Sequence, residues 1–167
     1  MKKLLMIAVV IAAAMSANAQ EKGTFAAGLR GGVQITKLEI QGLGIKETSN
    51  RFGIGAFGQY SLTNHWRVDL EGIYHPKKDG VSDFSLGLYF QYLFNVTEDF
   101  KIYPLLGYGF SFIQQEGEKS DTDSGIQLGL GLQYNLKNNW FVAGEYRYQP
   151  GIFGDAHSPM LSVGYRF

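Results

Sequence analysis

The chain contains no cysteine and only four prolines among its 167 residues. Without thiols it can form no disulfide and no thiolate metal site. Its 15 basic residues equal its 15 acidic ones, so it lacks the excess of basic charge that a nucleic-acid partner requires. Beyond residue 20, no apolar run approaches the roughly 20 residues of a membrane-spanning helix. If this chain enters a membrane, it must therefore do so as a closed sheet, in which every backbone amide is paired.

The first nineteen residues have the three parts of an export signal. Lys2 and Lys3 precede an apolar stretch over 4–15, and Ala17-Asn18-Ala19 forms an A-x-A cleavage site. We therefore expect a signal peptide over 1–19, cleaved after Ala19. The remainder, 20–167, has no linker or change of composition, so we expect one mature barrel domain there.

Hydrophobicity alternates with a period of two through most of the mature chain. From Ile126 to Tyr134, apolar residues occupy the even positions and Gln or Gly the odd ones, as in a strand with one apolar and one polar face. Each such segment is close to or above the roughly 9–11 residues that a tilted strand needs to cross a bilayer. We count eight, at 23–35, 51–62, 66–76, 83–95, 100–114, 125–135, 140–149 and 159–167.

Short and long connections alternate between these segments. Three short turns, within 60–66, 94–100 and 134–140, repeat the order aromatic, polar turn, aromatic. The other connections, at about 36–50, 77–82, 115–124 and 150–158, are mostly longer, which is typical of barrels with short periplasmic turns and long outer loops. We expect a periplasmic aromatic girdle beside the short turns and at the chain end: Tyr60, Trp66, Phe94, Phe100, Tyr134, Trp140 and Phe167.

The polar face of these segments differs from the surface of a water-soluble barrel. Lysine, common on water-exposed strands, occurs after the signal only in loops, turns and strand ends. The polar positions in mid-strand hold Gly, Ser, Gln and charges of both signs, which suits a narrow lumen where opposite charges pair to offset desolvation. The residues expected to form an interior charge network are Arg30, Arg67, Asp69, Glu71, Glu145, Arg147 and Arg166.

A few residues depart from the alternation. Some apolar residues occupy positions that the alternation assigns to the lumen, and some glycines occupy positions that it assigns to the outer face. This indicates a bulge or a shifted register in their strands. The residues concerned are Phe57, Ile73, Leu93, Leu105, Gly58, Gly72 and Gly144.

Three segments carry a resemblance to a known family. Residues 103–110 (YPLLGYGF) are similar to its Pro-aromatic-Gly-x-Gly strand, 162–167 (SVGYRF) to its terminal insertion signal, and 129–148 also resembles it. The family is that of the small outer-membrane β-barrel proteins of the OmpX and OmpA-transmembrane-domain type. The resemblance implies an all-β fold, an eight-stranded antiparallel up-and-down transmembrane β-barrel, in the outer membrane of a Gram-negative cell. It also implies roles in membrane anchoring, adhesion or surface defence, mostly without catalysis.

No cluster of residues favours a catalytic or metal site over a structural interpretation. The Gly-x-Gly patterns at 107–109 and 129–131 lie in mid-strand, without the helix that follows a nucleotide-binding loop. The acidic loop 116–124 holds only part of a calcium-loop pattern, so a solvated loop is favoured over a divalent-cation site. His157 and Ser158 point to opposite faces of an extended strand, and could form a nucleophile–base pair only if the chain kinks there.

We therefore expect a structural and cell-surface interaction role, of the adhesion or defence type, with no catalysis and no cofactor. The alternatives are a lipid A-modifying enzyme, for which His75 and His157 lie near the loop side, and a narrow pore, although side chains just fill the lumen of an eight-stranded barrel. The first loop, near 36–48, could extend the sheet as a protruding edge that captures a partner strand.

The expected partners follow from this location. They are outer-membrane lipid and lipopolysaccharide, the barrel-insertion machinery through the C-terminal strand, and an extracellular protein at the loops. We expect no nucleic-acid partner, and we expect the protein to be a monomer.

Overall fold

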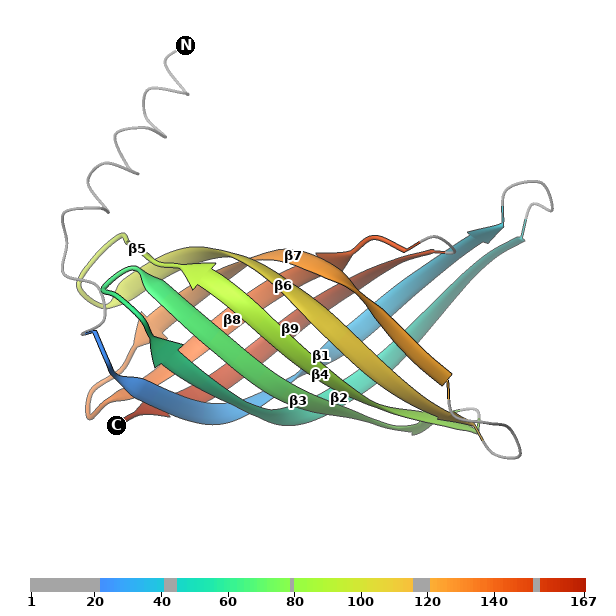
Figure 1. Ribbon diagram of the computed structural model, residues 1–167, viewed down its shortest axis with the longest axis horizontal. Coiled ribbons are helices and arrows are strands. Elements are labelled where there is room, and N and C mark those ends of the chain that lie inside the picture. The colour runs from blue at the N-terminus through green and yellow to red at the C-terminus, as the bar shows by residue number, and fades with distance from the viewer. Residues whose placement is uncertain (1–21, 41–44, 79, 116–120, 152–153) are drawn as a thin grey trace, which may run out of the picture.

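The chain forms a closed antiparallel β-barrel (Figure 1). The structure is a computed structural model, and it describes residues 22–40, 45–78, 80–115, 121–151 and 154–167. The strands are β1 (Phe25–Ile40), β2 (Ile45–Ser61), β3 (Trp66–Lys78), β4 (Val81–Tyr92), β5 (Phe94–Asn95), β6 (Phe100–Gln115), β7 (Asp121–Asn135), β8 (Trp140–Gln149) and β9 (Gly154–Arg166). β4 and β5 are one strand interrupted at Leu93, since both pair with β6. The barrel therefore has eight strands, and the predicted fold class is confirmed.

Each strand pairs with its neighbour in the chain, and the last strand returns to the first. β9 pairs with β1 from Ala26↔Arg166 to Leu38↔Gly154, which closes the cylinder. This closure removes the open edges that would leave backbone amides unpaired in a bilayer. Among the described residues, no helix is long and apolar enough to cross a membrane.

The predicted bulges at the parity exceptions are wrong. Pairing runs without a shift through all of these residues except Leu93, at which the strand is interrupted and the same register resumes at Phe94. The one register shift among the described pairs lies between His75 and Lys78. The side chains of Phe57, Ile73 and Leu105 are at most 4% exposed, and Leu93 is fully buried. Apolar side chains therefore belong to the interior of this barrel, where they pack beside the polar ones.

β1 and β2 are longer than the alternating pattern indicated. They pair without interruption to Ile40↔Ile45, so most of the segment 36–50 is strand and not the predicted loop. The connections 77–82, 115–124 and 150–158 are shortened in the same way, because β3, β4, β6, β7 and β9 extend into them. In Figure 1 the β1–β2 hairpin projects beyond the end of the barrel, opposite the end where the chain terminus lies.

The short turns share a hydrogen-bonding pattern. The Thr63 hydroxyl accepts a hydrogen bond from the Trp66 backbone N–H at 2.9 Å, and the Thr97 hydroxyl accepts one from Phe100 at the same distance. In the third turn Asn138 and Asn139 have φ angles of 59° and 65°, as tight hairpins require and asparagine tolerates. These turns fix the register of the strands that they join.

Candidate functional site: the polar network of the lumen

Polar side chains from every strand of the barrel meet in the middle of the lumen. Because side chains alternate along a strand, each strand directs every second residue inward. The members are Arg30 (β1), Gln59 (β2), Asp69 and Glu71 (β3), Tyr89 (β4), Tyr103 (β6), Gln127 (β7), Glu145 and Arg147 (β8) and Ser162 (β9). We call this set the lumen network. All of its members except Gln127 are buried.

Arg30 is at the centre of the lumen network. Its guanidinium donates hydrogen bonds to Asp69 Oδ2 and Glu145 Oε1, each at 3.0 Å, and also to Glu71. Its Nε donates to Ser162 Oγ at 2.9 Å. One arginine thus joins carboxylates from β3 and β8, on separate walls of the barrel.

Arg147 makes the second set of ion pairs. It donates to both carboxylate oxygens of Glu71 and to Glu145 Oε2. Its guanidinium carbon lies 4.1 Å from the centre of the Tyr89 ring, and the Tyr89 hydroxyl lies 3.0 Å from Glu71 Oε1. Two arginines and three carboxylates therefore share one buried site, where each charge has an opposite charge within hydrogen-bond distance.

The remaining predicted charges lie nearer the rim with the short turns. Arg67 donates to Gln91 Oε1 at 2.7 Å and to Gln133 Oε1 at 2.8 Å. Arg166 donates to Asn135 Oδ1 at 3.1 Å. The structure thus brings five of the seven predicted charges into one ion-pair cluster, whereas Arg67 and Arg166 bond to neutral amides.

Sequence reasoning missed the two tyrosines of the lumen network. The Tyr103 hydroxyl donates to Glu145 Oε1 at 2.8 Å, and Tyr89 contacts Glu71 as described above. In the segment 83–95 the even positions 84–94 are all apolar or aromatic, whereas Tyr89 has an odd position. This signal could have placed Tyr89 inside. Leu93 and Leu105 pack with both tyrosines, so an apolar layer adjoins the network.

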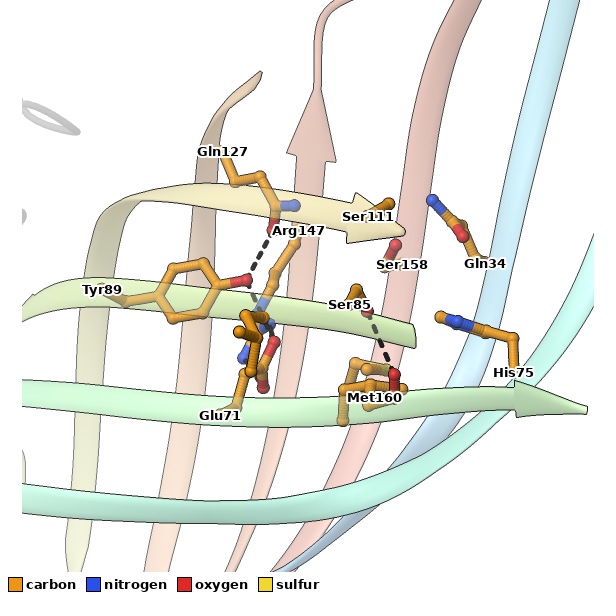
Figure 2. A pocket seen from close by; sticks show the side chains of 12 residues that line it. Gln34, Glu71, His75, Ser85, Tyr89, Ser111, Gln127, Arg147, Ser158 and Met160 are labelled. Carbon is orange, nitrogen blue, oxygen red and sulfur yellow. Dashed lines mark hydrogen bonds and ion pairs between the residues drawn. The ribbon is translucent and has the colours of Figure 1, made fainter. Parts of the chain in front are cut away.

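A small polar cavity lies on the side of the network that faces the projecting hairpin (Figure 2). Glu71, Tyr89 and Arg147 line its inner end, and His75 and Ser158 line it further out. Its volume of about 30 Å³ accommodates roughly two water molecules. His75 Nδ1 lies 2.9 Å from Asp83 Oδ2, and Asp83 also pairs with Arg51 at 2.6 Å.

Of the residues considered for catalysis, His75 and Ser158 line the same cavity, whereas His157 and Ser158 do not come together. Ser158 lines the lumen cavity, whereas His157 is on the outer face, where its Nδ1 lies 2.7 Å from the Tyr146 hydroxyl. No group of three or more His, Asp or Glu side chains able to hold a metal occurs in the described residues. Residues 116–120 of the acidic loop lie outside the described residues.

The seven aromatic residues of the predicted girdle all lie near one rim. Register pairs place Trp66 opposite Tyr92, Phe100 opposite Tyr134 and Trp140 opposite Tyr165. Trp66, Tyr134 and Trp140 are each close to half exposed. Their rings contact further aromatics, such as Tyr92 at 4.9 Å from Trp66.

Comparison with known proteins agrees with the barrel fold described above. A sequence model described as "Outer membrane protein beta-barrel domain" matches residues 4–167. No curated protein matches the chain.

Several solved structures share the fold. Ail, the attachment invasion locus protein of Yersinia pestis, is 20% identical with a TM-score of 0.54, over 87% of this chain and 99% of Ail. Ail in complex with the heparin analogue sucrose octasulfate gives 21% identity and a TM-score of 0.55, over 87% and 99%. The N-terminal β-barrel domain of Pseudomonas aeruginosa OprF is 17% identical with a TM-score of 0.64, over 89% of this chain and 100% of that domain.

Proposed function

Because the chain belongs to the outer membrane protein β-barrel domain family, we propose that it acts at the cell surface as a binding protein. The proposed contact surface is the outer edge of β2 in the projecting hairpin. We also propose that the lumen network serves to close and stabilise the barrel, and that the lumen does not conduct solutes.

The unequal pairing of β2 carries this proposal. On one side β2 pairs with β1 from Ile45 onward, but on the other side its pairing with β3 begins only at Ile54↔Tyr74. Among the described strand pairings, the segment 45–49 therefore has a register partner on β1 alone. The hairpin projects beyond the rim (Figure 1), so its edge is accessible.

An exposed strand edge favours one mode of binding. It presents a row of backbone N–H and C=O groups with which an extended segment of another protein can pair. Thr48 on this segment is exposed and polar, which keeps the edge soluble without blocking backbone pairing. Ail, a barrel of the same fold, is described as an attachment protein and was solved with a heparin analogue. This likeness supports an extracellular ligand for the present chain.

The lumen supports a binding role over a pore. The ion pairs of Arg30 and Arg147 span the interior, and the cavity beside them holds only about two waters. A lipid A-modifying activity would need an aligned nucleophile and base, and the separation of His157 from Ser158 speaks against that pair. The absence of steady conductance in planar bilayers would agree with a closed lumen.

The proposal includes the orientation of the barrel in the outer membrane. Export would remove the signal peptide after Ala19, and the rim with the short turns and the aromatic girdle would face the periplasm. The C-terminal strand would engage the insertion machinery, and the monomeric barrel would display the hairpin outside.

The hairpin can be shortened with the loss of one pairing of the barrel wall, Leu38↔Gly154. Lys37 and Thr48 are register partners, so replacing residues 38–47 by Asn-Gly joins them through a tight hairpin turn. We expect cells that carry this variant to lose adhesion to host-cell or matrix surfaces, while heat-modifiable migration shows the barrel to be folded. Deletion of 116–120, at the β6–β7 connection, is the matched control and should leave adhesion unchanged. Undiminished adhesion by the shortened variant would disprove the role of the hairpin.

A further inference from the structure

The outer wall of the barrel is uneven at mid-height, on the side formed by β7, β8, β9 and β1. At the level of Leu161, register pairing alternates large and small outward residues across neighbouring strands: Leu132, Gly144, Leu161, Gly31 and Ile54. Leu161 is 74% exposed, because a glycine lies beside it on each neighbouring strand. The two glycines form the floor of an apolar groove around this leucine.

The groove is large and almost wholly apolar. It is a hollow of about 780 Å³ that is open toward the outside, and its walls include Phe52, Leu130, Tyr146 and Pro159. A smaller hollow of about 360 Å³ continues from Gly144 and Leu161 toward Phe100. The larger part leads away from the rim with the short turns.

The other outward glycines do not produce a groove. A Cβ at Gly72 would meet the Phe84 ring at 3.1 Å, and one at Gly58 would meet Phe25 at 3.5 Å, so aromatic rings cover both. A Cβ at Gly144 would meet only the end of Leu161 at 3.7 Å. Open glycines are thus confined to one side of the wall.

We propose that this groove binds one acyl chain of an outer-leaflet lipopolysaccharide molecule. The site lies on the hydrocarbon-facing wall, where a void would lose dispersion contacts on one side and where a straight, flexible hydrocarbon chain is the available filler. A second barrel fits the groove less well. Two parallel cylinders touch only along a narrow strip, whereas the groove runs along the tilted strands. This inference rests on the orientation proposed above, which places the larger part of the groove in the outer leaflet.

The length and the outer end of the groove fit such a lipid. From Leu161 to His157, β9 advances about 13 Å along its own axis at roughly 3.3 Å per residue. At a tilt of about 45° this covers roughly 9 Å of the roughly 15 Å of one hydrocarbon leaflet. The hydrogen-bonded pair of Tyr146 and His157 lies at this level. Lys37, exposed two residues further out on β1, lies opposite Asp155 on β9, so the level above this pair carries charges of both signs. The Tyr146 hydroxyl and the His157 ring supply the hydrogen-bonding groups for a polar headgroup above an acyl chain.

Filling the floor of the groove tests the proposal. Gly31→Leu with Gly144→Leu would occupy it, and neither new Cβ meets an atom closer than 3.4 Å. The matched control is Gly58→Leu, an outward glycine remote from the groove. The full mature chain, folded in detergent, is incubated with short-core lipopolysaccharide, and native mass spectrometry counts the lipid molecules retained. We expect one molecule on the wild type and on the control, and about tenfold weaker retention by the double variant.

Each alternative occupant has its own outcome. Equal retention by the double variant would overturn the proposal, and so would equal retention of phosphatidylethanolamine by the wild type. A wild-type dimer that the double variant abolishes would make a second copy the occupant. If the double variant does not show heat-modifiable migration, Gly144→Leu alone carries the test, with about threefold weaker retention expected. Adhesion through the hairpin is unaffected by these changes, so failure here is distinguishable from failure of the proposed function.

Discussion

The lumen network and the projecting hairpin belong to the same strands but are held by different interactions. Arg30, midway along β1, contacts side chains from β3, β8 and β9. Farther along β1, the residues up to Ile40 are paired with β2, and pairing with β9 ends at Leu38. One part of the strand is fixed by many partners across the barrel, and the other by its neighbours in the sheet. This contrast predicts where substitutions will affect stability.

The largest effect is expected from removing the central cation. Arg30→Ala would leave Asp69, Glu71 and Glu145 with too little positive charge in a buried site. The loss of one partner from a buried ion pair costs roughly 3–5 kcal/mol, so we expect the free energy of unfolding in lipid vesicles to fall by about that amount. Arg51→Ala, in a partly exposed pair with Asp83, is the control and should cost less. A loss below about 1 kcal/mol for Arg30→Ala would contradict the central role of this residue.

The next largest loss of stability is expected from adding a methyl group to a glycine on the inner face of the barrel wall, which is more crowded than the outer face. A Cβ at Gly28, on the inner face, would overlap the carbonyl oxygen of Val163 and the Phe57 ring. Overpacking of this kind costs roughly 1–3 kcal/mol, so Gly28→Ala should lower the urea midpoint of unfolding. Gly144→Ala, on the outer face, should change stability by about 0.5 kcal/mol or less. Equal effects at the two sites would show that the inner face can adjust.

Much of this architecture follows from local patterns in the sequence. The period of two, the repeated aromatic turns and the restriction of lysine to strand ends identify the strands and their polar face. The partners within the lumen are different, because they depend on which walls face each other. Arg30 lies 39 positions from Asp69 and 115 from Glu145, and no periodicity encodes that meeting.

The strand lengths and the interior layers were also beyond local patterns. β1 and β2 continue past the alternating segments because each supplies the other's backbone hydrogen bonds, which requires no particular side chain. Phe57 and Ile73 point inward because the lumen above and below the charged layer needs apolar filling. A rule that assigns only polar residues to the interior therefore misplaced them as irregularities.

A smaller loss of stability is expected from removing the Tyr89 hydroxyl, at the edge of the lumen network. Tyr89→Phe removes the contacts with Glu71 Oε1 at 3.0 Å and with Gln127 at 2.8 Å, but it keeps the ring under Arg147. One buried hydrogen bond contributes about 1 kcal/mol, so we expect a loss of that size in vesicle unfolding. Tyr108→Phe, which removes an exposed contact with Ser124, should have a smaller effect. Identical losses would mean that burial does not decide the value of these bonds.

The smallest effect on stability is expected at the hairpin, despite the large number of residues involved. A two-stranded hairpin is marginally stable by itself, so replacing 38–47 by Asn-Gly should change the free energy of unfolding by only about 0.5 kcal/mol. Hydrogen exchange offers an independent measure: amides of 36–40 and 45–50 should exchange by local opening, well before those flanking Arg30. A destabilisation as large as that of Arg30→Ala would mean that the hairpin is part of the cooperative unit of the barrel. In that case loss of adhesion by the shortened variant would report misfolding, whereas a small change leaves the edge of β2 as the cause.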